Sequence, residues 1–266
     1  MNDYSLLLSV ATSAVDMAAA MMKTSRLTSV TAKGDRDLVS DVDLAIERQV
    51  REFLAEQTPG IGFVGEEDGV SGPGGGLTWA LDPVDGTVNY VHGHPLCGVS
   101  LALIDRAEPV LGVIDLAMLG RRYHAVHGGG AYADGLQITT TTVSSLRDAI
   151  VAIGDYAVGE GSRTKNQLRL AITARLTDHV QRIRMHGSAA TDLAFLAEGR
   201  VDAVVICSNS PWDIPAGVVI AREAGAAVTD LDGSQFDMDS SATIAANPGM
   251  IADLLDLARR AQSSIE

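Results

Sequence analysis

Apolar residues near the start of the chain recur at the spacing of one helix face. The positions are Tyr4, Leu7, Leu8, Ala11, Val15, Ala18 and Met22. Steps of three and four residues place these side chains on one stripe, so we predict an amphipathic first helix. The stretch lacks the basic start of a signal peptide, because Asp3 comes first and Asp16 interrupts it. We therefore predict neither a signal peptide nor a transmembrane segment.

The next periodic segment predicts a second helix that begins at Asp43. Its core face is formed by Ile46, Val50, Phe53 and Leu54, again at helical spacing.

Two short apolar runs then predict buried strands. They are Ile61–Val64 and Leu77–Leu81, both bounded by turn residues. The intervening Ser71–Gly76 segment is rich in glycine, and we interpret it as a flexible linker, with a mobile flap as the alternative.

The middle of the chain alternates apolar runs with turns. Strands at Val99–Ile104, Val110–Leu116 and Tyr123–Val126 would form an antiparallel meander. Gly128–Gly130 is followed by a predicted hairpin at Tyr132–Gly135. Because no strand and helix flank these glycines, we interpret them as turn glycines and not as a phosphate loop.

The second half alternates strands and helices without a repeated motif. Predicted strands are Ala149–Ile153, Val180–Met185 and Ala203–Cys207; predicted helices are Thr164–Arg175, Ser188–Ala197, Pro215 to the stop at Gly225, and Pro248 to about Arg260. The pattern predicts alternating helical and sheet layers in one domain over 1–266, with lobes of about 1–145 and 146–266.

Composition and charge narrow the function. The chain has 34 acidic and 20 basic residues, a net charge of −14, which argues against non-specific nucleic-acid binding. Its two cysteines, Cys97 and Cys207, do not suggest a disulfide framework, so we expect a reducing, cytoplasmic location.

The strongest chemical signal is a pair of carboxylates directly after a predicted strand. Asp82 and Asp85 are three residues apart in Asp-Pro-Val-Asp-Gly-Thr, and Glu66 lies upstream. Ligands of α/β sheets gather where strands end, and an oxygen-rich cluster suits a hard cation such as magnesium. Asp43 and Asp213 are further candidates, although each also fits a structural role near a helix start.

Taken together, these motifs resemble the inositol monophosphatase family of magnesium-dependent, lithium-sensitive phosphatases. The matching blocks are Asp37–Asp43, Phe63–Glu67, Asp82–Tyr90, Gly187–Ala190, Trp212–Gly217 and Ala221–Gly225. The resemblance implies an α/β (α+β) fold, a layered α-β-α-β-α sandwich of the inositol monophosphatase and fructose-1,6-bisphosphatase type.

The resemblance also assigns metal ligands. Glu66, Asp82 and the backbone carbonyl of Val84 would hold one magnesium ion. Asp82 would bridge to a second ion held by Asp85 and Asp213, and a third would lie near Glu66 through water. Two to three ions per site are therefore expected.

Catalytic and substrate roles follow from the same resemblance. Thr87, hydrogen-bonded to Asp43, would orient the attacking water, with Glu66 also in the catalytic set. Gly86 and Thr87 would offer backbone N–H groups to the phosphate.

Substrate hydroxyl contacts are assigned to Asp85, Ser188, Ala189 and Asp213. Many inositol phosphatases carry a Glu seven residues before the equivalent of Asp213, where this chain has Ile206. Ser208, Asn209 and Ser210 are alternative sources of hydroxyl contacts.

Two other features leave their roles open. Lys33 is either an active-site lysine or a solvated loop lysine. His92 and His94 have a spacing compatible with zinc, but no third ligand lies nearby, so we interpret them as loop residues.

The expected function is hydrolysis of a small phosphate ester, most specifically inositol 1-phosphate, by direct water attack. The alternatives are a same-fold phosphatase for histidinol phosphate, fructose 1,6-bisphosphate or a nucleotide phosphate, and a non-catalytic scaffold. No nucleic-acid or membrane partner is expected, and the resemblance implies a homodimer.

Overall fold

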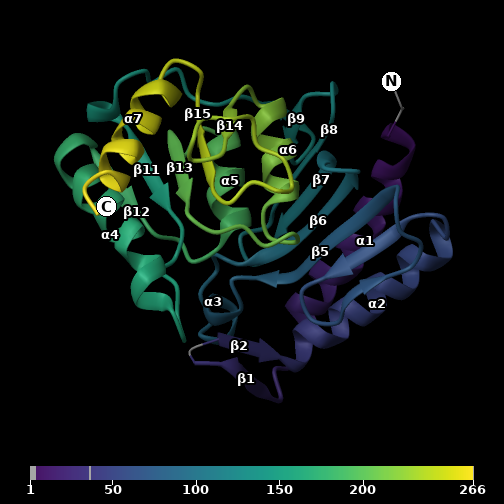
Figure 1. Ribbon diagram of the computed structural model, residues 1–266. Coiled ribbons are helices and arrows are strands. Elements are labelled where there is room, and N and C mark those ends of the chain that lie inside the picture. The colour runs from purple at the N-terminus through teal and green to yellow at the C-terminus, as the bar shows by residue number, and fades with distance from the viewer. Residues whose placement is uncertain (1–3, 36, 266) are drawn as a thin grey trace.

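Five layers of secondary structure build the protein, helices alternating with sheets (Figure 1). The computed structural model describes residues 4–35 and 37–265. The long helices are α1 (Ser5–Thr24), α2 (Asp41–Gln57), α4 (Ser162–His179), α5 (Ala189–Ala197), α6 (Pro215–Glu223) and α7 (Ile251–Gln262). The predicted α-β-α-β-α sandwich is confirmed.

The larger sheet has eight strands in the order β10-β9-β8-β7-β6-β5-β3-β4. Their bounds are β3 (Gly62–Gly65), β4 (Gly69–Ser71), β5 (Leu77–Asp85), β6 (Gly98–Asp105), β7 (Glu108–Leu116), β8 (Arg121–Val126), β9 (Ala131–Ala133) and β10 (Leu136–Ile138). Every pair except β3–β5 is antiparallel, so the predicted meander and the turn at Gly128–Gly130 are confirmed.

Alternation along the strands gives this sheet two different buried faces. Leu81, Leu101 and Leu103 pack against α1 and α2. Ala80 and Ala102 point the other way, toward α5 and α6. The small alanines allow the middle helical layer to lie close to the sheet.

The smaller sheet has five strands in the order β12-β11-β13-β15-β14. Their bounds are β11 (Ile150–Ile153), β12 (Arg182–Arg184), β13 (Ala203–Ile206), β14 (Ala227–Thr229) and β15 (Thr243–Ala246). One face packs against α4 and α7 and the other against α5 and α6. The middle helices are therefore shared by both sheets, while the lobe boundary near residue 145 stays a prediction.

Helix α1 is the one described helix long and apolar enough to cross a membrane by length and composition. Its buried side chains, including Ala11, Val15 and Met22, pack in the core beside the larger sheet. This packing accounts for its apolar character.

Four features differ from the sequence-based predictions. The second helix begins at Asp41, because Ser40 is its N-cap and Asp43 completes a capping box from the third helical position. The polar stretch before it forms a hairpin of β1 (Val30–Gly34) and β2 (Asp37–Ser40). Strands β4, β14 and β15 were not predicted, and the last helix begins at Ile251 and not at Pro248. The short helices α3 (Thr87–Val91) and η1 (Leu146–Asp148) complete the fold.

Replacing Gly112 by Ala should destabilise the contact between β7 and α6. An added Cβ would lie 2.4 Å from the Ala216 carbonyl oxygen, and such overpacking costs about 1–3 kcal/mol of unfolding free energy. Urea denaturation of Gly112→Ala measures the loss. Gly60→Ala is the control, because an added Cβ there meets nothing within 4 Å; equal stability of the two variants would contradict this account.

Candidate active site

The end of β5 carries an irregularity that interrupts its pairing with β6. Pairing with β6 runs to Asp82–Ser100, lapses, and resumes at Asp85–Gly98. Pro83 lies in this gap, where its missing N–H costs no ladder hydrogen bond. The strand thus continues to Asp85, beyond the predicted end at Leu81, although the parallel pairing with β3 ends at Leu81.

Three carboxylates from separate elements meet beside this irregularity. Glu66 follows β3, Asp82 lies on β5 and Asp213 precedes α6. One oxygen from each lies within 4.8 Å of the others. Chain segments 147 residues apart, from position 66 to position 213, therefore build one oxygen-lined site.

Burial and mutual repulsion of the three carboxylates favour the binding of a cation at this site. Asp82 is 3% exposed, and burial, together with repulsion from Glu66, Asp85 and Asp213, raises its pKa well above the usual value. Burial, then repulsion from Glu66, raises the pKa of Asp213 to about 6. Buried carboxylates packed this closely fit a hard divalent cation, which prefers oxygen ligands and offsets their charge.

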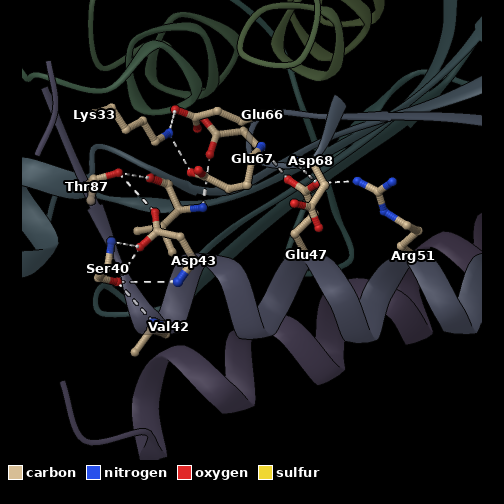
Figure 2. Close-up of polar contacts among 12 residues, drawn as sticks. Lys33, Ser40, Val42, Asp43, Glu47, Arg51, Glu66, Glu67, Asp68 and Thr87 are labelled. Atoms are coloured by element: carbon tan, nitrogen blue, oxygen red, sulfur yellow. Dashed lines mark hydrogen bonds and ion pairs between the residues drawn. The ribbon is translucent and has the colours of Figure 1, made fainter. Parts of the chain in front are cut away.

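Lys33 lies on strand β1, and its ammonium group is paired with two carboxylates at this site. From β1, its Nζ donates to Glu66 Oε1 at 2.8 Å and to Glu67 Oε1 at 2.7 Å (Figure 2). Burial opposes its charge, but the hydrogen bonds that it donates to both carboxylates, together with their negative charges, outweigh burial and raise its pKa. The β1–β2 hairpin thus brings a positive charge to the carboxylate group.

Thr87 and Asp43 are joined as expected. Thr87 Oγ1 is 3.1 Å from Asp43 Oδ1 (Figure 2). It is also 3.2 Å from the Val84 carbonyl oxygen, so its single proton has two possible acceptors. The other Asp43 oxygen accepts from the backbone N–H and hydroxyl of Ser40. Burial raises the pKa of Asp43 despite these bonds. The capping box therefore fixes the carboxylate so that its free oxygen faces Thr87.

Asp85 is held by the start of α5. Its carboxylate accepts from the Ser188 hydroxyl, from Ala190 N at 2.7 Å and from Ala189 N at 3.3 Å. Burial, followed by repulsion from Asp213, raises its pKa to about 8 even though the bonds from Ser188 and Ala190 oppose this. In this conformation Asp85 links the larger sheet to the middle helices and lies outside the three-carboxylate group.

A pocket of about 620 Å³ opens beside Asp85 and Asp213. The expected substrate residues Ser188 and Ala189 line it, as does Ile206. Ser208 and Asn209 also line it, but Asn209 is already engaged by the Ser240 carbonyl and the Thr243 hydroxyl. Gly86 lies apart from this lining as the N-cap of α3, with φ at 88°.

The histidines lie outside the three-carboxylate group. His92 is the C-cap of α3, and the backbone N–H of His94 in the following loop donates to Asn89 O at 2.7 Å. His186 pairs through Nδ1 with Asp192, which lines the pocket.

Sequence reasoning missed Glu47, whose carboxylate shapes the turn that carries Glu66. Glu47 is fully buried and accepts from Glu67 N and Asp68 N, both at 2.8 Å, and from Arg51 (Figure 2). A Cβ at Gly65 would lie 2.4 Å from the Glu47 carboxyl carbon. An acid on the apolar face of α2, one turn after Asp43, was the signal available in the sequence.

Comparison with known proteins agrees with this geometry. The sequence profile of the inositol monophosphatase family matches residues 3–265. The chain belongs to the inositol monophosphatase family.

Relatives of this phosphatase family span most of the chain. Inositol-1-monophosphatase ImpA of Mycolicibacterium smegmatis is 38% identical over 88% of this chain and 84% of its own length. A fructose-1,6-bisphosphatase/inositol-1-monophosphatase of Aquifex aeolicus is 36% identical over 86% of this chain and 84% of its own. Extragenic suppressor protein suhB from Bartonella henselae shares the fold with a TM-score of 0.88 and 29% identity, over 96% and 99% of the two chains. The protein is accordingly a phosphatase.

The metal-free protein should lose stability as the pH rises. Asp85 and Asp213 have native pKa values of about 8 and about 6, above the unfolded value of about 3.9. Their protonated forms favour the folded state, so this contribution is full below about pH 4 and is lost toward about pH 8. Urea denaturation of chelator-treated protein across this range measures the trend, and magnesium should restore stability at the upper end. A pH-independent stability without metal would contradict the interpretation.

Glu47→Gln should weaken metal binding without touching a ligand. The neutral amide holds Glu67 N and Asp68 N less strongly, so the Glu66 turn is less well fixed. Metal affinity should fall about tenfold or more, as for other groups that orient metal ligands. Titration calorimetry with Mn²⁺ measures it directly, with Glu52→Gln on the exposed side of α2 as the matched control. Unchanged affinity in Glu47→Gln would exclude the positioning role.

Proposed function

We propose that this phosphatase is a magnesium-dependent inositol-1-monophosphatase. The observation that carries the proposal is the meeting of Glu66, Asp82 and Asp213 close to the hydrogen-bonded pair of Thr87 and Asp43. The names of relatives such as ImpA support the choice of substrate.

Two to three magnesium ions fit the donors that the chain presents. Glu66, Asp82 and the Val84 carbonyl would hold one, while Asp82, Asp85 and Asp213 would hold a second, and a third would lie near Glu66. Oδ1 of Asp85 is the oxygen available, because its one hydrogen bond among the described residues, from Ala189 N, is long at 3.3 Å. When bound, such ions neutralise the phosphate and promote attack by water.

Thr87 and Asp43 would manage the proton of the attacking water. When the Thr87 hydroxyl donates to Asp43 Oδ1, its oxygen lone pairs are free to accept from a water molecule. The water proton would pass to Thr87 Oγ1 as the Thr87 proton passes to Asp43, whose pKa is raised by burial. Water then displaces the alcohol directly, with no phosphorylated enzyme.

The residues around the carboxylate group would also bind the phosphate and the hydroxyls of the substrate. Gly86 and Thr87 would offer backbone N–H groups to the phosphate, and Asp85, Ser188, Ala189 and Asp213 would contact substrate hydroxyls. Lys33 would balance the charge of Glu66 and Glu67, to which it already donates.

Ile206 is the reason for considering alternative substrates. Its apolar side chain lines the pocket and cannot accept a hydrogen bond from a substrate hydroxyl. A charged contact that would distinguish one substrate from another is therefore missing at this position. Histidinol phosphate, fructose 1,6-bisphosphate and nucleotide phosphates are the competing substrates, and a scaffold without activity is the competing class.

We further propose that the protein is a cytoplasmic homodimer and that lithium inhibits it. Light scattering tests the dimer, and a substrate panel with magnesium, with and without lithium, tests the rest. Similar rates on inositol 1-phosphate and unrelated esters would count against a dedicated inositol enzyme.

Substitutions at Thr87 and Asp85 separate an enzyme from a scaffold. Thr87→Val should lower kcat by about 10²–10⁴, the range of general acid–base contributions, and Asp85→Asn should abolish magnesium-dependent phosphate release. Thr177→Val and Asp178→Asn, both exposed on α4, are matched controls that should leave the rate unchanged. Full activity in Thr87→Val would exclude its catalytic role, and no turnover on any ester by the unaltered protein would exclude the enzyme.

A further inference from the structure

His186 lies where the carboxylate-bearing end of β5 meets the start of α5. It opens the Gly187 bend, which spans residues 186–188 and ends at Ser188, the N-cap of α5 that donates to Asp85. The proposed chemistry uses Asp85 and the start of α5 and leaves His186 without a role. Two separate contacts nevertheless fix this residue, one through its backbone and one through its ring.

The backbone contact ties His186 to α3. The side-chain amide of Asn89 donates through Nδ2 to the His186 carbonyl and to the Leu96 carbonyl, both at 2.7 Å. The approach is close, because a Cβ added at Gly187 would lie 3.1 Å from Asn89 Nδ2. Asn89 comes two residues after Thr87 on the same short helix, so this contact sets the position of the bend relative to Thr87.

The ring contact ties His186 to α5. Its Nδ1 lies 2.5 Å from Asp192 Oδ1, and the ring packs edge-on against Phe195 with centroids 5.5 Å apart. Asp192 is 1% exposed, and burial raises its pKa to about 6 while the bond from His186 opposes this rise. The carboxylate is therefore ionised at neutral pH, and Nδ1 carries the proton and donates. A buried carboxylate is unfavourable without such a donor, so the pair holds the bend to the helix.

The Gly187 bend packs directly against residues that the proposed chemistry uses. A Cβ added at Gly86 would lie 3.0 Å from the Gly187 carbonyl oxygen, which leaves no space between the bend and the start of α3. Just beyond the bend, Asp85 accepts from the Ser188 hydroxyl and from Ala190 N. A shift of the bend would therefore displace both Asp85 and the backbone N–H of Gly86.

We propose that His186 is a positioning residue for the hydrolysis. Anchored to α3 through Asn89 and to α5 through Asp192, it fixes the Gly187 bend. The fixed bend keeps Asp85 in the orientation that binds a divalent cation. This role rests on the proposed function and adds to it a residue that acts only through its neighbours.

His186→Phe tests the ring contact. The phenyl ring still packs against Phe195 but donates nothing to Asp192, so the bend is held less firmly. Titration calorimetry should show an affinity for Mn²⁺ lowered about tenfold, the lower end of the range for groups that orient metal ligands. The KM for inositol 1-phosphate at saturating magnesium should change less than about twofold. His186→Asn should restore the affinity, because its amide nitrogen is bonded to Cγ as Nδ1 is and can donate to Asp192.

His179→Phe is the matched control. His179 Nδ1 also makes a hydrogen bond, to the Arg175 carbonyl at 2.7 Å, but it lies at the exposed end of α4. Its replacement removes the same kind of contact far along the chain from the bend and should leave the Mn²⁺ affinity unchanged.

Asn89→Ala tests the backbone contact, and it decides the matter if His186→Phe does not fold. The change removes the donor to the His186 carbonyl and should also lower the Mn²⁺ affinity about tenfold. In the double variant with His186→Phe, the combined loss should be smaller than the sum of the two single losses, because both act through one bend.

Two results would overturn the positioning role while leaving the phosphatase intact. One is an unchanged Mn²⁺ affinity in both His186→Phe and Asn89→Ala, and the other is an affinity in His186→Asn no higher than in His186→Phe. An unaltered protein that binds no Mn²⁺ and hydrolyses no inositol 1-phosphate would instead exclude the proposed function, and the positioning role with it.

Discussion

Repulsion among closely packed carboxylates, one of them buried and two half-buried, is the constraint on which the rest of this structure depends. Glu66, Asp82 and Asp213 bring oxygens within 4.8 Å of one another, and Asp82 is almost fully buried. Such a group is unfavourable without positive charge beside it. The packing of two sheets around shared helices holds the acids together against this repulsion. A cation bound between them would relieve the repulsion, and this property suits the site to phosphate chemistry.

Neighbouring acids are stabilised by fixed donors, each in a different way. Asp43 is bonded within a helix cap, Asp85 at the start of α5, and Glu47 beneath the Glu66 turn. Glu66 itself meets the Lys33 ammonium. Because backbone N–H groups cannot move independently of the fold, they set the orientation of each carboxylate before any ligand arrives.

Much of the fold was predictable because its core elements are periodic. The first helix and the β6–β8 meander bury continuous apolar faces, so their patterns were clear. The hairpin β1–β2 was missed because every residue of β1 is exposed, which leaves no hydrophobic pattern to detect. Strands β14 and β15 are three and four residues long, too short for periodicity. The helix start was misplaced because Asp41 and Asp43 are both plausible first-turn acids, and only the bonds to Ser40 distinguish them.

The sequence by itself determined the kind of chemistry, since the spacing of Asp82, Asp85 and Thr87 and the blocks around Glu66 and Asp213 are local features of the chain. Only the tertiary structure decided that Lys33 reaches Glu66 and that Glu47 supports the turn. Those relations join residues far apart in sequence, and burial and long-range packing create them. Local patterns carry no information about which distant charged side chains will meet.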